Sequence, residues 1–300
     1  VEYVPVKSYS AAVTAFRNDQ VQLAWFGGLS GVQARRLVPG SVALAQGSED
    51  DAFMSYFIAH HSTGLERADA LPDAIEGMSL TFGSRTSTSG RLMPEHFFRQ
   101  RFDDADPEAF FSRVGYSGDH SRTIALVEAG TWDLGAVNYT VWEAAVADGR
   151  VDTDRVEVIW ATPPYPDYNW TLRGDADERF GEGFTDRVQA AFLEMDDPEL
   201  LASFPREAFI PADNALYAPI EEVAEELGYV PNSHARALVS ARSSFIGMVV
   251  SDIANPFFPP LIRAAQRCAE EHGLYLTLAD TDSDPEREAA ILQRLRPQVG

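Results

Sequence analysis

A run of five hydroxyl side chains is the first feature of this sequence that could do chemistry. The run lies within residues 82–94, between a predicted strand and a predicted helix, and comprises Ser84, Thr86, Ser87, Thr88 and Ser89. A helix start offers free backbone N–H groups and the positive end of a dipole, which suit an anion. A Ser/Thr-rich turn with an N-cap residue would need only one of these hydroxyls. The pattern therefore leaves two interpretations open, an oxyanion cradle and an ordinary helix start.

Three other segments could contribute to a binding site. His120 precedes a predicted helix, where it is either a donor to an oxyanion or a surface residue. Residues 163–170 are rich in proline and aromatic side chains, which is typical of a rigid crossing between lobes or of a surface loop. Trp25-Phe26-Gly27-Gly28 follows a predicted strand, where glycine lets the backbone approach a ligand or simply forms a tight turn.

Motifs for catalysis are missing from the sequence. It contains no G-x-S-x-G, C-x-x-C or H-E-x-x-H motif, and Cys268 is its single cysteine. His60 and His61 are adjacent in a predicted strand, so they point to opposite faces and make a poor metal pair. We predict no catalytic residue, no metal and no cofactor; a hydrolase that uses His120 is the weakest of the hypotheses.

Strand and helix patterns alternate along the chain, which predicts an α/β protein with parallel sheets. Strands are predicted over residues 1–6, 21–26, 42–46, 53–59, 80–83, 134–138 and 156–161. Helices are predicted over residues 10–18, 30–37, 89–101, 120–129, 141–147, 184–195 and 219–227. After Gly228 the pattern restarts with helices over 232–240, 259–272 and 285–295 and strands over 245–252 and 274–279. Two strands are too few for a covered parallel sheet, so this tail is expected to be part of a domain.

Charge separates the same two parts of the chain. The 300 residues carry a net charge of −22, which argues against nucleic acid and anionic membranes as partners. Residues 1–228 hold 38 acidic and 17 basic side chains, whereas residues 229–300 hold 8 and 7. No window of about 18 apolar residues is present to span a membrane. The shift near residue 228 indicates that two sequences of different history meet there.

Residues 1–228 resemble the substrate-binding component of ABC importers for phosphonate-, phosphite- and selenate-type oxyanions. The likeness rests on stretches in one order at residues 4–13, 23–35, 82–94, 117–120, 127–130, 162–170 and 180–185. It implies a two-lobed type 2 periplasmic-binding fold, with lobes of about residues 1–79 plus 170–228 and residues 80–169. It also implies an ABC permease partner and an extracytoplasmic location, and a strand, a helix and an export signal ahead of Val1.

The resemblance assigns the ligand contacts by position. The candidate ligand-binding residues are Tyr9, Trp25, Phe26, Ser87, Thr88, Ser89, His120, Asn138, Tyr139 and Asp167. We expect a tetrahedral oxyanion to lie between the lobes, held by hydroxyls and helix N-termini. The sequence does not distinguish phosphonate, phosphite, phosphate and selenate, because hydroxyls and amides serve all of them.

Residues from about 225 to 300 are similar to the lac-repressor family of transcription regulators. The likeness covers residues 226–238, 246–252, 255–258 and 279–282, and implies the hinge helix and the start of a type 1 periplasmic-binding-like domain. Asn232, Ala235 and Leu238 fall at the DNA-hinge positions, where the leucine wedges into the minor groove. The helix-turn-helix and most of the effector domain are not in this sequence, so a regulator is the alternative function and the chain is expected to be a chimera.

Overall fold

A computed structural model describes residues 2–230, 245–250, 258–271 and 275–281. The chain divides into two compact units, Val1–Val230 and Pro231–Gly300. The sequence placed this boundary at residue 228, two residues earlier. Among the described residues, no helix is both long and apolar enough to cross a membrane.

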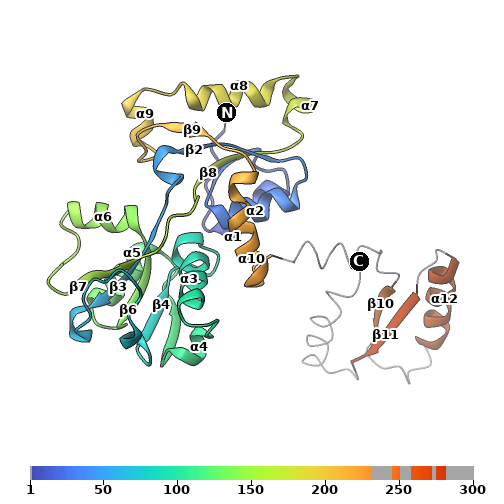
Figure 1. The fold of residues 1–300 in the computed structure, drawn as a ribbon. Helices are drawn as coiled ribbons and strands as arrows, with labels where there is room; N and C mark the ends of the chain where they lie inside the picture. Colours follow the sequence, from blue (N-terminus) through green and yellow to red (C-terminus); the bar gives the residue numbers. More distant parts are fainter. Residues whose placement is uncertain (1, 231–244, 251–257, 272–274, 282–300) are drawn as a thin grey trace. The chain divides into compact units, whose positions relative to one another are not determined.

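The first unit consists of two lobes, each built on its own sheet (Figure 1). The first-lobe sheet has the order β1-β8-β2-β9, from strands Leu23–Phe26, Asn169–Leu172, Val42–Gly47 and Phe209–Pro211. The second-lobe sheet has the order β5-β4-β6-β3-β7, from strands Arg113–Tyr116, Ser79–Phe82, Leu134–Asn138, Ser55–His60 and Val156–Ala161. The chain therefore passes to the second lobe after β2 and returns to the first before β8.

Helices cover both faces of each sheet. In the first lobe α1 (Tyr9–Arg17) and α2 (Gly28–Leu37) lie on one face. The opposite face carries α7 (Ala176–Phe180), α8 (Phe184–Leu193) and α9 (Pro198–Ala202), which pack around Leu44, Leu172 and Phe192.

The second lobe has a core on each side of its sheet. One side is covered by α3 (Met93–Arg101) and α4 (Pro107–Phe110), and the other by α5 (His120–Glu128) and α6 (Tyr139–Ala147). A π-helical turn, η4 (Thr88–Leu92), runs directly into α3. The remaining short turns are 3-10 helices: η1 (Ser48–Asp50), η2 (His61–Thr63), η3 (Asp73–Ile75) and η5 (Ala215–Tyr217).

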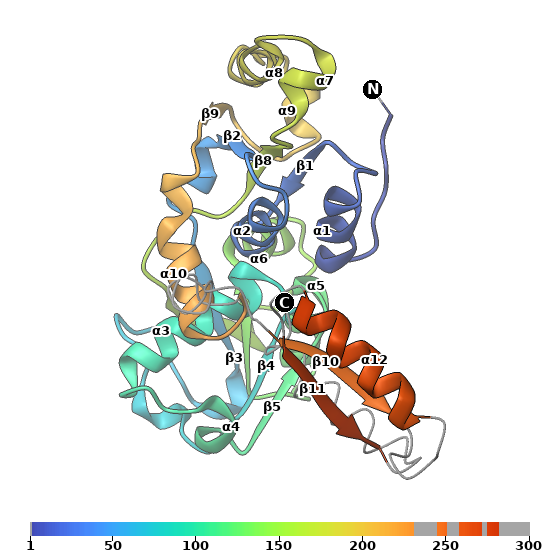
Figure 2. The ribbon, with the colours of Figure 1, turned by 90° about the vertical axis from the view of Figure 1, so that its right-hand side faces the viewer.

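The last helix of the first unit, α10 (Ala218–Glu226), contacts both α2 of the first lobe and α3 of the second. Figure 2 shows α10 descending from the first lobe to α3. The shared core around it includes Leu29, Val32, Leu92, Met93 and Ile220. The two lobes are therefore joined by this helix as well as by the two crossing segments.

Three sequence predictions about the fold are wrong. Both sheets contain antiparallel pairs, because β3 and β8 each follow a crossing between lobes instead of a helix that returns the chain to the same edge. Strand β3 belongs to the second lobe, whereas the predicted lobe limits placed residues 55–60 in the first. The predicted strand over residues 1–6 does not form in residues 2–6, which are all exposed and belong to neither sheet of the first unit, so their apolar side chains have no core to pack against.

The second unit contains a parallel pair of strands. Strands β10 (Phe245–Val250) and β11 (Tyr275–Asp280) pair in parallel, and α12 (Phe258–Glu271) packs on β11. The helices predicted over residues 232–240 and 285–295 lie outside the described residues, as do Asn232, Ala235 and Leu238.

Candidate functional site

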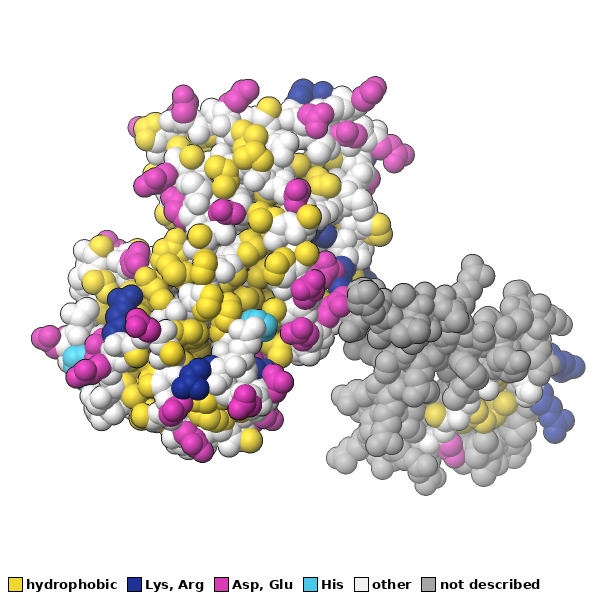
Figure 3. Space-filling model, in the orientation of Figure 1, with side chains coloured by type: hydrophobic (Ala, Val, Ile, Leu, Met, Phe, Trp, Pro, Cys, Tyr) yellow, Lys and Arg dark blue, Asp and Glu magenta, His cyan; other side chains and the backbone are white. Residues whose placement is uncertain are grey.

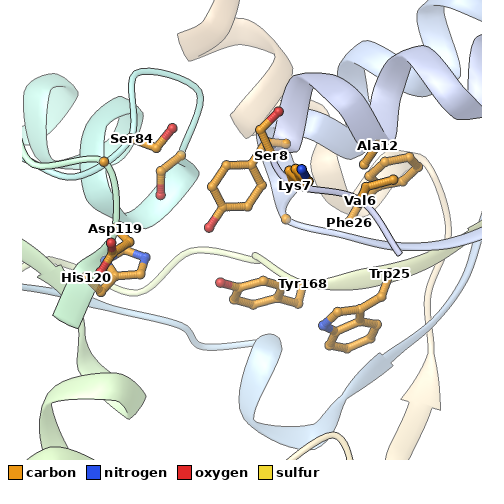
Figure 4. Close-up of a pocket in the computed structure, with 14 residues that line it drawn as sticks. Val6, Lys7, Ser8, Ala12, Trp25, Phe26, Ser84, Asp119, His120 and Tyr168 are labelled. Atoms are coloured by element: carbon orange, nitrogen blue, oxygen red, sulfur yellow. The ribbon is translucent and has the colours of Figure 1, made fainter. Parts of the chain in front are cut away.

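A cavity of about 410 Å³ lies between the two lobes of the first unit. Figure 4 shows Ser84, Asp119 and His120 on one side of it, facing Ser8, Lys7 and Phe26. The full lining comprises Val6, Lys7, Ser8, Tyr9, Ala12, Trp25, Phe26, Gly27, Ser84, Ser87, Gly118, Asp119, His120 and Tyr168. Because both lobes supply lining residues, a change in the angle between the lobes would change the cavity.

Three helices begin at this cavity with their N-terminal ends. Their N-cap residues Ser8, Ser87 and Asp119 line it, at the starts of α1, η4–α3 and α5. Each cap accepts one backbone N–H, from Ala11 at 3.2 Å, Gly90 at 2.9 Å and Arg122 at 2.8 Å. The other N–H groups of each first turn have no carbonyl partner within their own helix. Three positive dipole ends, each with N–H donors left over, therefore converge on one cavity, and this arrangement favours the binding of an anion.

The N-terminus of α2 also points this way, but protein side chains already occupy it. Asp167 Oδ1 accepts the N–H of Gly28 at 2.8 Å, and Thr88 Oγ1 accepts the N–H of Leu29 at 3.0 Å. A Cβ on Gly27 would lie 3.2 Å from each of these two oxygens, so glycine is the residue that fits there. This fourth helix start is used to join the lobes and is not free for a ligand.

Burial changes the charge state of Asp167. The side chain is 1% exposed, and its Oδ2 has no hydrogen-bond partner within the described part of the chain. Burial raises the pKa of Asp167 to about 7, and the hydrogen bond from Gly28 opposes that rise. Near neutral pH this carboxyl group is therefore partly protonated.

His120 is a neutral hydrogen-bond donor at the cavity. Burial lowers the pKa of its imidazole to about 4, so the ring is uncharged at neutral pH. Its Nδ1 accepts the backbone N–H of Asn138 at 3.3 Å, which leaves the ring proton on Nε2. The side chain can therefore donate one hydrogen bond without bringing a full charge to the site.

Aromatic side chains form another wall of the cavity. Trp25 stacks on Tyr168 with ring centroids 5.7 Å apart and planes 11° apart. The guanidinium of Arg206 lies 5.7 Å from the Trp25 centroid and 5.5 Å from that of Tyr168. Asp50 holds Arg206 with two bonds, Nε to Oδ2 at 2.7 Å and Nη2 to Oδ1 at 2.8 Å. A buried ion pair thus braces the aromatic wall from behind.

The Tyr9 hydroxyl belongs to the same polar network. Burial, followed by the nearby charge of Asp167, raises the pKa of Tyr9, and the hydroxyl interacts with the side chains of Tyr168 and Ser87. A protonated phenol is a donor to an anion. Tyr9 therefore adds a second neutral donor beside His120.

The structure brings half of the sequence-predicted residues to the cavity. Those that line it are Tyr9, Trp25, Phe26, Ser87 and His120. The hydroxyl run and the histidine, 31 positions or more apart in the sequence, meet at Gly90, where an added Cβ would lie 3.0 Å from His120 Cε1 and Ser87 Oγ. As contacts to a ligand, these residues stay predictions.

The other five predicted residues surround the cavity without lining it. Thr88 Oγ1 accepts the backbone N–H of Leu29, and the backbone carbonyl of Ser89 accepts a hydrogen bond from the Ser55 hydroxyl at 2.7 Å. Asn138 caps α6 through the N–H of Thr140 at 2.8 Å and donates to the Tyr168 hydroxyl at 3.4 Å. The remaining two are Tyr139, whose ring packs 4.8 Å from Phe53, and Asp167 on Gly28. Of these five, Asn138 contacts two lining residues directly, His120 and Tyr168.

Several lining residues were not selected from the sequence. Asp119 stands directly before the helix predicted over residues 120–129, and Ser8 lies two positions before the start of the helix predicted over residues 10–18. The N-cap preference for aspartate and serine was therefore the signal that could have found them. Tyr168 lies in the aromatic segment that was selected, next to Asp167. Lys7 carries no comparable pattern. Within the described ranges, no three His, Cys, Asp or Glu side chains are grouped as a metal site requires.

Comparisons with known proteins match the first unit along most of its length. Residues 1–217 match the family described as ABC transporter, phosphonate, periplasmic substrate-binding protein. The probable ABC transporter phosphite binding protein PhnD1 of Prochlorococcus marinus is 40% identical over 238 residues, which cover 77% of this chain and 80% of that protein. The solved structure of PhnD1 from that organism in complex with methylphosphonate superposes with a TM-score of 0.70 at 39% identity, covering 77% of this chain and 87% of the other.

The end of the chain matches a different group of proteins. The ribose operon repressor of Halalkalibacterium halodurans is 41% identical over 75 residues, which are 25% of this chain and 23% of that repressor. The chain thus spans about a quarter of the length of this relative. The two likenesses follow one another along the sequence, as the two units do in the structure.

Proposed function

The chain belongs to the periplasmic substrate-binding proteins of phosphonate ABC transporters, and on this premise we propose that its first unit captures one tetrahedral oxyanion in the cavity between the lobes. The observation that carries the proposal is the convergence of three helix N-termini, capped by Ser8, Ser87 and Asp119, on that cavity. The donors offered there are backbone N–H groups, hydroxyls, a neutral imidazole and the ammonium of Lys7.

A binding mode built from dipoles suits the charge of the chain. The net charge of −22 would repel an anion at long range. Figure 3 shows acidic side chains spread over the visible face of both lobes of the first unit, with fewer basic ones among them. Short-range donors inside the cavity therefore have to supply the attraction that the surface does not.

The ligand we expect is a small phosphonate or phosphite. PhnD1 of Prochlorococcus marinus was solved in complex with methylphosphonate, and a cavity of about 410 Å³ has room for an anion of that size. Hydroxyl and amide donors do not distinguish phosphite, phosphonate, phosphate and selenate by their oxygens alone. The aromatic wall of Trp25 and Tyr168 gives a fourth substituent of the anion an apolar neighbour.

We propose that the cavity binds its ligand without turnover. His120 has its pKa lowered to about 4, which makes it a poor proton acceptor near pH 7. Asp119 uses Oδ1 to cap Arg122 and does not hold the imidazole, whose Nδ1 faces the Asn138 N–H. These contacts favour a donor role for His120 over the hydrolase hypothesis.

The family membership also supports a partner and a location. We propose that the liganded first unit delivers the oxyanion to an ABC permease on the extracytoplasmic side of a membrane. Closure of two lobes around a solute presents the permease with a surface that the open form lacks.

The alternative function, a regulator of the lac-repressor type, rests on the second unit. Its described part is β10, α12 and β11, a parallel βαβ arrangement that also begins many other α/β domains. A gel shift with a palindromic operator tests this alternative, and we expect no specific shift. A specific, competable shift would favour the regulator.

Isothermal titration of the full chain tests the proposed function. We expect one site for methylphosphonate or phosphite, and no heat with chloride at the same ionic strength. The His120→Ala variant, which lacks one of the proposed donors, should bind the same ligand more weakly. No heat with methylphosphonate, phosphite, phosphate or selenate, in protein whose circular dichroism shows it folded, would overturn the proposal.

A further inference from the structure

The chain does not leave the first unit at the end of α10. Gly228 has a φ of +73°, a left-handed conformation that glycine adopts without strain. The N–H of Tyr229 bonds the carbonyl of Ala224 at 2.7 Å, and the N–H of Gly228 bonds that of Glu225 at 3.2 Å. This pair of bonds is a Schellman motif, which ends a helix and folds the next residues back along it. Tyr229 and Val230 are thereby turned toward the lobes.

Both residues then pack into the core that the two lobes share. Val230 is 5% exposed and lies in one cluster with Leu29 and Val32 of α2 and with Leu92 and Met93 of the second lobe. Tyr229 packs against the same cluster, and its carbonyl accepts the side-chain amide of Gln33 from α2 at 3.3 Å. Tyr229 and Val230, the last residues of the first unit, are therefore bound to α2 of the first lobe by packing and by one hydrogen bond.

Tyr229 also reaches the second lobe through its hydroxyl. The phenol donates to Glu95 Oε2 on α3 at 3.4 Å. Glu95 is 4% exposed and is fixed by Arg91 at 2.7 Å and Arg99 at 2.9 Å. Because both arginines lie on η4–α3, the hydroxyl of Tyr229 bonds a carboxylate that is rigidly part of that helix.

The helix η4–α3, which Tyr229 bonds through Glu95, also carries the hydroxyl run of the cavity. Ser87 and Thr88 stand at the start of η4–α3, and Thr88 Oγ1 accepts the N–H of Leu29 on α2 at 3.0 Å. The helices α2 and η4–α3 are thus joined at one end by Thr88 and at the other by Tyr229. Loss of the second joint would leave the first as a pivot, about which the second lobe, with Asp119 and His120 at the cavity, could rotate relative to the first lobe.

We propose that Tyr229 and Val230 form a latch that sets the spacing of the two lobes and so positions the second-lobe side of the cavity. Tyr229 is a positioning residue, because it lies outside the cavity lining. Both residues belong to the sequence that resembles the repressor family, yet they complete the core of the binding unit. The junction between the two sequences therefore contributes to the binding unit itself. The effect on affinity rests on the proposed oxyanion binding, whereas the effect on lobe spacing does not.

The distance between the lobes in the ligand-free full chain tests the latch. Spin labels would be placed at Asp186→Cys on the first lobe and Glu108→Cys on the second, both exposed, with Cys268→Ser to remove the native thiol. We expect Tyr229→Phe and Val230→Ala each to broaden the distance distribution measured by double electron–electron resonance. The matched control is Tyr3→Phe, the same change at a tyrosine that is 87% exposed.

The kinetics of methylphosphonate release give a second readout. Stopped-flow fluorescence should show that Tyr229→Phe raises the dissociation rate about threefold to tenfold, the size of one ordinary hydrogen bond, with the association rate unchanged. Distance distributions of both variants that match Tyr3→Phe would overturn the latch, even if methylphosphonate binds normally. A parent chain that binds no oxyanion, with broadened distributions in the variants, would support the latch and contradict the proposed function.

Discussion

The imidazole Nδ1 of His120 accepts the backbone N–H of Asn138 at 3.3 Å, at the point where β6 passes into α6. This bond fixes the tautomer of a histidine that is 9% exposed and lines the cavity. The free Nε2–H then faces the same space as the helix starts capped by Ser87 and Asp119. A neutral donor in this position bonds an anion without adding a positive charge to that of Lys7, which also lines the cavity.

Replacing His120 by alanine should weaken binding by the same factor across neutral pH. Removal of one donor to an anion is expected to raise the Kd for methylphosphonate about tenfold or more. Because the pKa of His120 is lowered to about 4, the ring stays neutral from pH 6 to pH 8. The ratio of the two Kd values, in which the titration of the ligand cancels, should therefore be constant over that range by calorimetry. A ratio that grows steeply as the pH falls through 6.5 would mean that a charged imidazolium binds the anion.

Replacing Asp167 by asparagine should change the pH dependence of stability. The pKa of Asp167 is about 7 in the folded chain and near 3.8 when unfolded, so the folded state holds the extra proton between these values. The free energy of unfolding therefore falls as the pH rises toward 7, by at most about 1.4 kcal/mol per pH unit from this group. An asparagine side chain would keep the acceptor for the Gly28 N–H and remove the charge. The Asp167→Asn variant should therefore gain stability relative to the parent as the pH rises from 5 to 7.

Urea unfolding followed by tryptophan fluorescence measures this difference. All five tryptophans lie in residues 1–230, so the signal reports the first unit alone. The exposed Asp186→Asn is the control and should show no such trend. A stability difference between Asp167→Asn and the parent that stays flat with pH would contradict the buried, proton-binding role of Asp167.

The sequence predicted those elements whose signals are local. The helix predicted over residues 120–129 forms as His120–Glu128, because Asp119 supplies an N-cap, and the strand over 156–161 forms as predicted. Strand β8 was not predicted, since its polar residues Asn169 and Thr171 hide the strand pattern. Both side chains are 0% exposed. Arg35 Nη1 on α2 donates to Asn169 Oδ1 at 3.3 Å and to Thr171 Oγ1 at 3.1 Å. That partner lies more than 130 positions away in the chain.

The candidate site shows the same limit. The hydroxyl run and His120 were selected because helix starts and donors are visible in a short stretch of sequence, whereas Tyr9 was assigned only by the family resemblance. The part played by Asp167 depends on Gly28, which is 139 residues away, so its capping of α2 could not be read from its neighbours. Likewise, the assignment of residues 55–60 to the second lobe follows from the pairing of β3 with β6 and β7, which no local pattern encodes.

Two serines that line the cavity should separate binding from stability. Ser87 Oγ caps the N–H of Gly90 at 2.9 Å, so Ser87→Ala should weaken binding and also cost about 1 kcal/mol of unfolding free energy. Ser84 caps no helix, and its hydroxyl makes only long contacts of 3.5 Å to the backbone N–H and the hydroxyl of Thr86, so Ser84→Ala should weaken binding with little change in stability. Calorimetry and urea unfolding of both variants, with the exposed Ser112→Ala as control, check this. Unchanged affinity in both variants would remove the hydroxyl run from the site.

Asp50 and Arg206, the ion pair behind the aromatic wall, should contribute to the free energy of unfolding as a unit. Arg206→Met leaves Asp50, which is 0% exposed, without its partner and should cost about 3–5 kcal/mol of unfolding free energy. The double variant Asp50→Asn/Arg206→Met should lose less than the sum of the single variants, because no charge is then left buried. Arg150→Met, in the exposed pair with Asp148, is the matched control and should cost under about 1 kcal/mol. Additive losses would show that the pair does not act as a unit.

The central claim is that backbone N–H groups at three helix starts hold an oxyanion between the lobes. Titration of the ¹⁵N-labelled, deuterated full chain with methylphosphonate, followed by amide chemical shifts, tests it residue by residue. We expect the largest shifts at Tyr9, Ser89 and His120, with only a small shift at Gly28, whose N–H is held by Asp167. Saturating ligand that leaves the amides of these three helix starts unmoved, or that moves a different surface instead, would contradict the account.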